Sequence, residues 1–199
     1  DSWAEDLEIE AESGANIETA DRNTIPGRES VSSKVSYEFN ETVKYTTIKY
    51  VAYVMTPSSS SVHPGATFIL RNLLSCKYDI YVLVAYNNSD NKPNKFQATL
   101  AYDEPTKRNN NKRLKNENED DPDNFKTNYF SNKSPYVDEN GEFRLVDSVL
   151  VAKDFEFPVC YRGLTDAYAT LTIKGYFKST EKNKYSREIH IDKIVLKAK

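Results

Sequence analysis

The 199-residue sequence has few of the residues on which metal and catalytic sites usually depend. It holds two histidines, two cysteines and one methionine. Neither His63 nor His190 has a cysteine or a second histidine near it in sequence, so the ligand spacing of a zinc site is lacking. Phosphate-binding loops, dinucleotide fingerprints and G-x-S-x-G motifs are also absent. These absences argue against the enzyme classes that need such motifs, and we expect no catalytic residues.

Long apolar runs and an excess of one charge are absent as well. No run approaches the roughly 20 apolar residues of a membrane-spanning helix, so we predict no membrane insertion of this segment. The formal net charge is −3 with both signs interspersed, which argues against a nucleic-acid partner. The chain begins at Asp1 without an initiator methionine or a signal-like segment. We therefore expect a longer precursor whose signal, and any upstream domains, are missing here.

Two cysteines leave two interpretations open. Cys76 and Cys160 have no metal-ligand spacing. They form either a disulfide, which requires an oxidising compartment, or two thiols among core residues. Their positions beside apolar strands favour the thiols.

The stretch Leu73–Tyr86 predicts the centre of the fold. From Tyr78 onwards, apolar residues occupy both faces of an extended chain, interrupted only by Asp79. A strand that is apolar on both faces is typical of the middle of a covered sheet. The polar run NNSDNKPN then ends the strand.

Other segments alternate between apolar and polar residues, and none shows the three-four repeat of a helix. We expect residues 96–102 to be the antiparallel partner of the central strand. Pro26 and Gly27 predict a turn in a polar stretch, and a phase shift predicts a bulge near Asp192. The expected strands are residues 7–12, 36–39, 46–55, 67–70, 96–102, 143–151, 155–159, 169–173 and 188–196. This pattern predicts an all-β fold: one β-sandwich domain over residues 1–199, of the jelly-roll type with long surface loops.

Residues 103–124 differ from the rest in composition. The run EPTKRNNNKRLKNENEDDPD has almost nothing to bury and changes from basic to acidic along its length. Such a segment is typical of a mobile surface insertion. The alternative is a binding loop, because long loops in compact domains are often functional.

Several motifs together resemble galactose-binding-like carbohydrate-binding modules. The opening IEAES (Ile9–Ser13), the strand KYDIYVLVAYNN (Lys77–Asn88) and the closing IHIDKIVL (Ile189–Leu196) are similar to their first, central and last strands. A closer resemblance, over Phe68–Leu196, is to the C-terminal β-sandwich of surface lipoproteins, often with fasciclin domains, from polysaccharide-foraging gut bacteria. It rests on four motifs, at Leu74–Val82, Pro93–Phe96, Val151–Pro158 and Ile191–Leu196.

The resemblance implies a non-catalytic domain that binds a polysaccharide or oligosaccharide. It also implies a location at the bacterial cell surface or in the periplasm, as part of a lipid-anchored precursor. Two alternatives remain open. One is a structural or adhesion spacer that docks a neighbouring domain of the same precursor or another protein. The other is an accessory or catalytic domain of a glycoside hydrolase, although no carboxylate pair stands out in the sequence.

The resemblance further implies a structural calcium that ties the first strand to the last. In this chain its ligands would be Glu10, Glu12 and Asp192. Carboxylate oxygens are the ligands that calcium prefers. The alternative is that the glutamates form an ordinary solvated strand face.

Sugar binding usually uses exposed aromatic rings and hydrogen-bonding side chains. We expect an exposed, coplanar aromatic platform if a sugar binds there; the alternative is that the rings cap the core. The candidate carbohydrate-binding residues are Asn124, Asn128, Tyr129, Phe130, Tyr136, Tyr176 and Tyr185.

Overall fold

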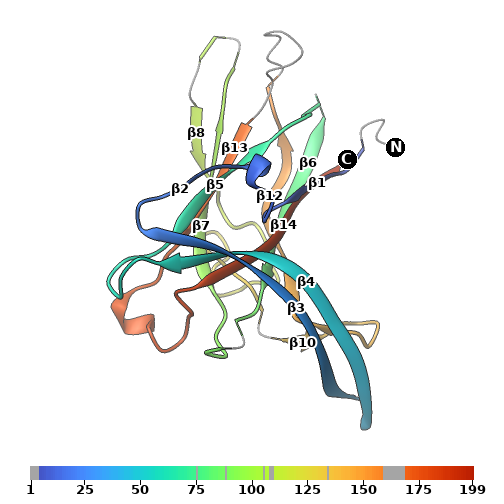
Figure 1. Ribbon diagram of the computed structural model, residues 1–199. Helices are drawn as coiled ribbons and strands as arrows, with labels where there is room; N and C mark the ends of the chain where they lie inside the picture. The colour runs from blue at the N-terminus through green and yellow to red at the C-terminus, as the bar shows by residue number, and fades with distance from the viewer. Residues whose placement is uncertain are drawn as a thin grey trace.

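The structure is a computed structural model that describes residues 5–74, 76–87, 89–104, 106–107, 110–133, 135–158 and 169–199. These residues form two six-stranded antiparallel sheets and a small two-stranded one (Figure 1). Apart from strands, the described segments hold two single-turn 3₁₀ helices, η1 (Gly14–Asn16) and η2 (Ser179–Glu181). The predicted all-β class is therefore confirmed. Within these ranges there is no helix with the length and apolar character needed to cross a bilayer.

The first sheet has the strand order β12-β6-β14-β4-β3, and β1 also pairs with β14. β14 pairs with β4 near its start and with β1 further along, where Leu7 lies opposite Leu196. The strands of this sheet are β1 (Leu7–Glu10), β3 (Thr24–Phe39), β4 (Thr42–Pro57), β6 (Lys77–Ala85), β12 (Val146–Glu156) and β14 (Ile189–Ala198).

The second sheet has the order β2-β5-β13-β7-β8, with β9 also paired to β7. Its strands are β2 (Ile17–Ala20), β5 (Gly65–Leu70), β7 (Lys95–Tyr102), β8 (Asn110–Arg113), β9 (Phe130–Ser131) and β13 (Ala169–Gly175). The third sheet is a short hairpin of β10 (Tyr136–Val137) and β11 (Phe143–Arg144).

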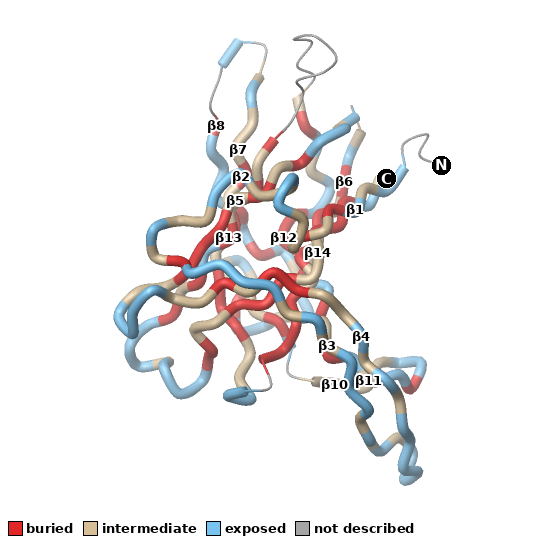
Figure 2. Tube along the Cα trace, viewed as in Figure 1, coloured by how far each residue is buried: buried red, intermediate tan, exposed pale blue. Residues whose placement is uncertain are grey.

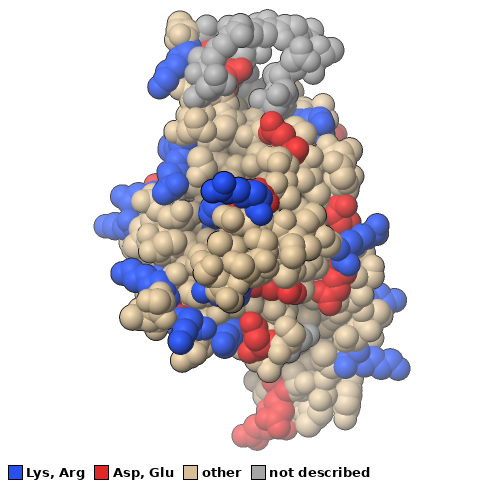
Figure 3. Space-filling model, turned by 60° about the vertical axis from the view of Figure 1, so that its left-hand side comes forward, with Lys and Arg blue, Asp and Glu red and all other residues tan. Residues whose placement is uncertain are grey.

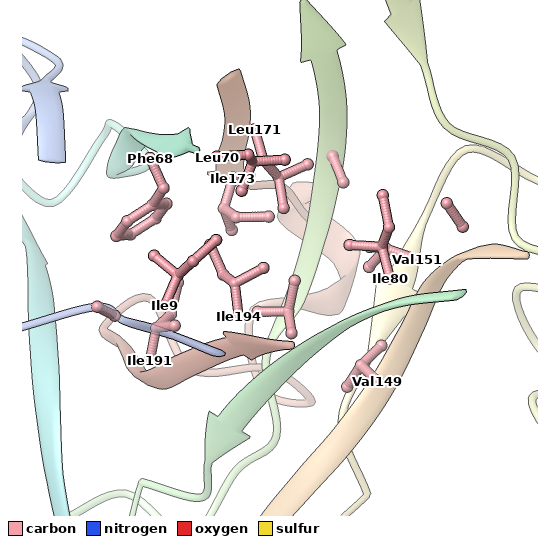
Figure 4. Close-up of a cluster of buried hydrophobic side chains, with 14 of the residues drawn as sticks. Ile9, Phe68, Leu70, Ile80, Val149, Val151, Leu171, Ile173, Ile191 and Ile194 are labelled. Carbon is pink, nitrogen blue, oxygen red and sulfur yellow. The ribbon is translucent and has the colours of Figure 1, made fainter. Parts of the chain in front are cut away.

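The two large sheets pack face to face around an apolar core (Figure 4). One side of β6 supplies fully buried residues such as Tyr78 and Ile80, and the second sheet supplies Phe68 and Leu171. β6 lies between β12 and β14, so the predicted central strand is confirmed. Its other side carries half-buried residues such as Tyr81. The sandwich architecture follows from this packing.

Two predictions about individual strands are wrong. β7 does not pair with the central strand, because it lies in the other sheet beside β13, β8 and β9. Alternation shows that a segment has one buried face, but not which sheet it joins. The predicted turn at Pro26 and Gly27 is part of β3, which runs without interruption through both residues. Proline is tolerated there because β3 is an edge strand.

The predicted bulge at Asp192 is confirmed. The register of β14 against β6 shifts between Ile191 and Lys193, which leaves Asp192 as the extra residue. Ile191 before the bulge and Ile194 after it are both fully buried. The bulge therefore lets both halves of β14 face the core and turns Asp192 away from it.

Within the predicted insertion at 103–124, residues 110–124 bury more than their composition suggests, whereas the mobility of the insertion stays a prediction. β8 pairs with β7, and Leu114, Asn116 and Asn124 are buried. The Asn116 amide donates to Tyr129 O at 2.9 Å, which satisfies a loop carbonyl that lies outside any ladder. Asparagine side chains thus supply hydrogen bonds that an apolar-pattern argument does not count.

Whether Cys76 and Cys160 pair stays a prediction. Cys76 is half-buried against the core and forms no disulfide with a described residue, while Cys160 lies outside the described residues.

β3 and β4 continue beyond the sandwich as a two-stranded ribbon, which we call the arm (residues 31–51). Figures 1 and 2 show the arm projecting from the buried body with its residues exposed or half-buried. It ends in a two-residue turn in which Asn40 and Glu41 both have positive φ, the pattern of a type I′ hairpin. The β10–β11 hairpin braces one face: the Tyr37 hydroxyl donates to Gly141 O at 2.9 Å, and the Tyr37 and Phe143 ring centroids lie 5.5 Å apart.

Candidate functional site

The three predicted calcium ligands come together where β1 meets the bulge of β14. Glu10 ends β1 opposite Lys193, and the Ala11 amide donates to Asp192 O at 3.2 Å. One ligand atom from each of Glu10, Glu12 and Asp192 lies within 4.8 Å of the others. The first and last strands therefore converge on one acidic group.

The carboxylates of this group repel one another, and the nearby Lys193 offsets only part of that repulsion. Burial raises the pKa of Asp192 to about 6; Lys193 opposes this shift, while Glu10, Glu12 and Glu8 add to it. Lys193 Nζ lies 3.5 Å from Glu8 Oε2 and 3.6 Å from Glu10 Oε1. The lysine is thus drawn toward the glutamates of β1, and Asp192 pairs with none of the described cations at salt-bridge distance.

The acidic group fits a calcium ion. Glu12 Oε2 is buried and has no hydrogen-bond partner among the described residues, and an unpaired buried carboxylate oxygen is costly. Three carboxylates offer the hard oxygen ligands that calcium takes. A bound ion would offset most of their negative charge and hold β1 against β14.

Three of the predicted sugar-binding tyrosines gather around one lysine. Lys95 Nζ lies 4.8, 6.0 and 5.6 Å from the ring centroids of Tyr129, Tyr176 and Tyr185. The same ammonium lies 3.1 Å from Glu181 Oε2. Aromatic residues from distant parts of the sequence therefore share one cation, which is an arrangement that stabilises partly buried charge.

This tyrosine cluster is not the coplanar platform expected from the sequence. The rings of Tyr129 and Tyr176 stack on each other with centroids 4.7 Å apart and an interplanar angle of 17°. His63 stacks with Tyr176 at 6.4 Å, and Tyr185 is only 4% exposed. Because the rings mainly cover one another, they leave little aromatic face to a ligand.

The other predicted sugar-binding residues are dispersed. Phe130 is fully buried and stacks with Phe96, so its ring belongs to the core. Asn124 is buried, and its amide donates to Ser131 Oγ at 2.7 Å. Asn128 is exposed, and its amide donates to the Leu114 carbonyl at 3.2 Å. Tyr136 lies in β10 with the Lys133 ammonium 5.2 Å from its ring centroid.

A polar pocket of about 590 Å³ lies on the outer side of the first sheet. His190 lies between two core residues of β14, Ile189 and Ile191, so alternation directs its ring away from the core. The lining comes from β3, β4, β14, the segment before β14 and the segment after β6. Its members are Gly27, Arg28, Glu29, Ser30, Val31, Ser32, Ser33, Tyr50, Val54, Tyr86, Asn87, Ser89, Glu188 and His190.

A histidine between two carboxylates forms the floor of this pocket. His190 Nε2 lies 2.7 Å from Glu188 Oε1, and Nδ1 lies 2.7 Å from Glu29 Oε2. The Glu188 contact is aligned as a hydrogen bond, whereas the Glu29 contact is close but off the direction of one. The histidine side chain is only 8% exposed. The two carboxylates thus hold the ring and keep part of their oxygen surface toward the pocket.

Buried asparagines position the segment that carries Glu188. The Asn94 amide donates to Ser186 O at 3.2 Å and to Glu188 O at 2.8 Å. The Asn87 amide donates to Ser186 Oγ at 3.1 Å. Because these amides fix the chain just before β14, Glu188 enters the pocket in a defined place.

Two tyrosines give the pocket protonated hydroxyls. Burial raises the pKa of Tyr50 to about 12, and Glu29 and Asp192 add to this shift. Burial, followed by Asp90, raises the pKa of Tyr86. Both hydroxyls therefore keep their protons at neutral pH and can donate as well as accept hydrogen bonds.

Sequence reasoning missed this pocket. It placed a turn where β3 supplies Gly27 and its neighbours, and it assigned His190 no functional role. The signal that was present is the alternation around His190, since Ile189 and Ile191 flank it. What no pattern shows is that β3, β4 and β14 bring Glu29 to that histidine.

The comparisons with known proteins leave the family open. No protein-family model matches the chain, and no curated protein matches it significantly. Because the comparisons name no family, the pocket, the acidic group and the tyrosine cluster are interpreted from their own chemistry.

Basic and acidic side chains are interspersed over the face shown in Figure 3.

Proposed function

We propose that the chain is a non-catalytic carbohydrate-binding domain and that the polar pocket holds the sugar. One observation carries the proposal: a pocket of about 590 Å³ combines hydroxyl, amide, carboxylate and guanidinium groups with two tyrosine rings. Its volume falls within the roughly 300–1,000 Å³ of small-ligand sites. Sugars need this mixture, because their hydroxyls hydrogen-bond while their C–H faces pack on aromatic rings.

The charges of the pocket select among sugars. Glu29 and Glu188 accept hydrogen bonds from neutral hydroxyls and attract a protonated amine, whereas they repel carboxylate or sulfate groups. Arg28 is the one arginine or lysine among the described residues of the lining. We therefore expect neutral or amino sugars to bind better than uronic acids or sulfated sugars.

The resemblance described above supports the same function, and it adds surface display of a lipid-anchored precursor to the proposal. A spacer or adhesion module is the main alternative, because packed aromatics such as Tyr176 and Tyr129 suit a purely structural role. Hydrolysis is a weaker alternative. Glu29 and Glu188 flank one pocket, but both lie against His190 instead of facing each other across an open cleft.

A binding screen with matched variants tests the proposal. The full chain is applied to a panel of neutral, amino and acidic polysaccharides, and a retained glycan is titrated by calorimetry as an oligosaccharide. We expect Tyr50→Ala and Glu188→Gln each to weaken binding about tenfold or more, since each removes contacts made in the pocket.

Tyr129→Ala is the matched control, because it removes a ring outside the pocket. Full affinity in Tyr129→Ala with loss in Tyr50→Ala supports the pocket, and the opposite result moves the site to the tyrosine cluster. Retention of no glycan class favours the spacer. Chromatography of each oligosaccharide after incubation tests hydrolysis, and we expect it to be recovered intact.

A further inference from the structure

The outer edge of β3 has no strand beside it within the described ranges. β3 and β4 are 16 residues long each, and β3 pairs only with β4. Unpaired edges of this length invite pairing with another strand, and proteins usually shorten or cover them. This edge is neither short nor covered by a strand.

The hairpin turn determines which backbone groups point outward. The two-residue turn at Asn40 and Glu41 makes Phe39 and Thr42 a hydrogen-bonded pair. The register continues without a shift, so the odd residues of β3 bond to β4 and the even residues direct their N–H and C=O groups outward. Pro26, which lacks an N–H, occupies an even position and so costs the ladder no bond.

We propose that the arms of two copies of this chain pair through β3, antiparallel about a two-fold axis at Ser36. Such an interface uses the same surface on both copies. It places Ser36 opposite Ser36 of the second copy as a hydrogen-bonded pair. The two hairpins then form one continuous four-stranded sheet.

Charge complementarity identifies a second copy as the occupant. Lys34 and Glu38 are exposed, carry opposite charges and lie two positions on either side of Ser36. The proposed register sets Lys34 of each copy opposite Glu38 of the other, which gives two cross-strand ion pairs. On the opposite face it sets Val35 against Tyr37, both half-buried within one chain.

The brace prepares the arm for this contact. Tyr37 and Phe39 lie against the β10–β11 hairpin, with the Tyr37 hydroxyl bonded to Gly141 O. Because the strand is already extended and supported, pairing requires little additional ordering.

Sedimentation velocity over about 1–100 µM tests the proposal, since a contact of this size is expected to be weak. We expect wild-type chain to dimerise and Lys34→Glu or Glu38→Lys alone to weaken dimerisation about tenfold, because each creates two like-charge pairs. An equimolar mixture of the two variants should dimerise again. The double variant Lys34→Glu/Glu38→Lys should also recover wild-type association.

Two further variants separate pairing from folding. The Ser36 N–H points outward and makes no hydrogen bond to β4. Ser36→Pro removes this N–H, so it should abolish dimerisation and leave the melting curve nearly unchanged. Lys182→Glu, an exposed charge reversal near η2, should leave dimerisation unaffected. A wild-type chain that stays monomeric overturns the proposal, as does a dimer that neither Lys34→Glu nor Ser36→Pro weakens. If the wild-type chain is monomeric, the outer edge of β3 would instead be a site for a strand of another protein.

Discussion

The sandwich and the arm share two strands, β3 and β4, yet the two regions are held by different forces. Near the base of β4, Tyr53 and Met55 are buried in the core, whereas Tyr45 near the tip is 79% exposed. Apolar burial stabilises the base. The arm is held by backbone hydrogen bonds between its strands and by one brace. The comparison shows that a strand such as β4 can extend well beyond the part of it that is buried in the core.

The largest expected difference between these regions comes from removing one ring in each. Phe68 is fully buried, and its ring centroid lies 5.8 Å from that of Tyr53. Phe68→Ala should lower the free energy of unfolding by about 3–5 kcal/mol through lost burial and a cavity. Tyr45→Ala should change it by less than about 0.5 kcal/mol. Urea unfolding followed by circular dichroism measures both, and equal losses would contradict the separation of arm and core.

A smaller effect is expected where the β10–β11 hairpin braces the arm. Gly141 has a φ of +78°, and an added Cβ would lie 2.8 Å from Phe39 Cε1. Gly141→Ala should therefore cost about 1–3 kcal/mol through backbone strain and displacement of Phe39. Hydrogen exchange should accelerate mainly in the arm. Gly14→Ala is the control, because nothing lies within 4 Å of its added Cβ; an arm that stays protected in Gly141→Ala would show that the brace is not needed.

The smallest expected effect concerns the acidic group at the bulge of β14. The pKa of Asp192 is raised to about 6 in the folded state, above the roughly 3.9 of an unfolded chain. The folded state therefore binds the proton more tightly, and this residue makes the protein less stable as the pH rises from about 4 to about 7. In the presence of chelator at pH 7, Asp192→Asn should stabilise the fold by about 1 kcal/mol, after allowance for solvent screening of a half-exposed group.

With calcium in place of chelator, the wild-type chain should become more stable than Asp192→Asn. Millimolar calcium should raise the melting temperature of the wild-type chain by binding only the folded state, and it should leave Asp192→Asn unchanged. Asp154→Asn is the matched control. Because hydrogen bonding to Lys199 lowers the pKa of Asp154, this substitution should destabilise the fold, whereas Asp192→Asn stabilises it in chelator. A wild-type melting temperature that does not respond to calcium would rule out the metal and leave a solvated acidic face.

The sequence predicted what depends on alternation and missed what depends on long-range pairing. The alternating apolar residues of β6 and the phase shift at Asp192 identified a central strand and a bulge, because both are local patterns. Within β3 only residues 36–39 were predicted as a strand, although Val35, Tyr37 and Phe39 alternate with polar residues, so the arm was not foreseen. Hydrogen bonding to β4, which no periodicity records, makes it a strand.

The candidate sites divide in the same way. The carboxylates of Glu10, Glu12 and Asp192 were identified through a resemblance at the two ends of the chain, and the structure brings them together. Tyr129 and Tyr176 were identified as aromatics outside the strong strands, and their mutual stacking could not be predicted because it requires the relative position of two loops. Glu29 beside His190 depends on the register of three strands, which the sequence does not reveal.

The pairing of Leu7 with Leu196 has a mechanical consequence. Tension applied through the two ends of the chain would act at the same end of the β1–β14 pair and would open its hydrogen bonds one after another, like a zipper, instead of shearing them together. Rupture would therefore need little force until it reached Glu10, beside the bulge. A cation held by Glu10, Glu12 and Asp192 would act there as a catch, so calcium would set the load at which the first strand detaches from the domain.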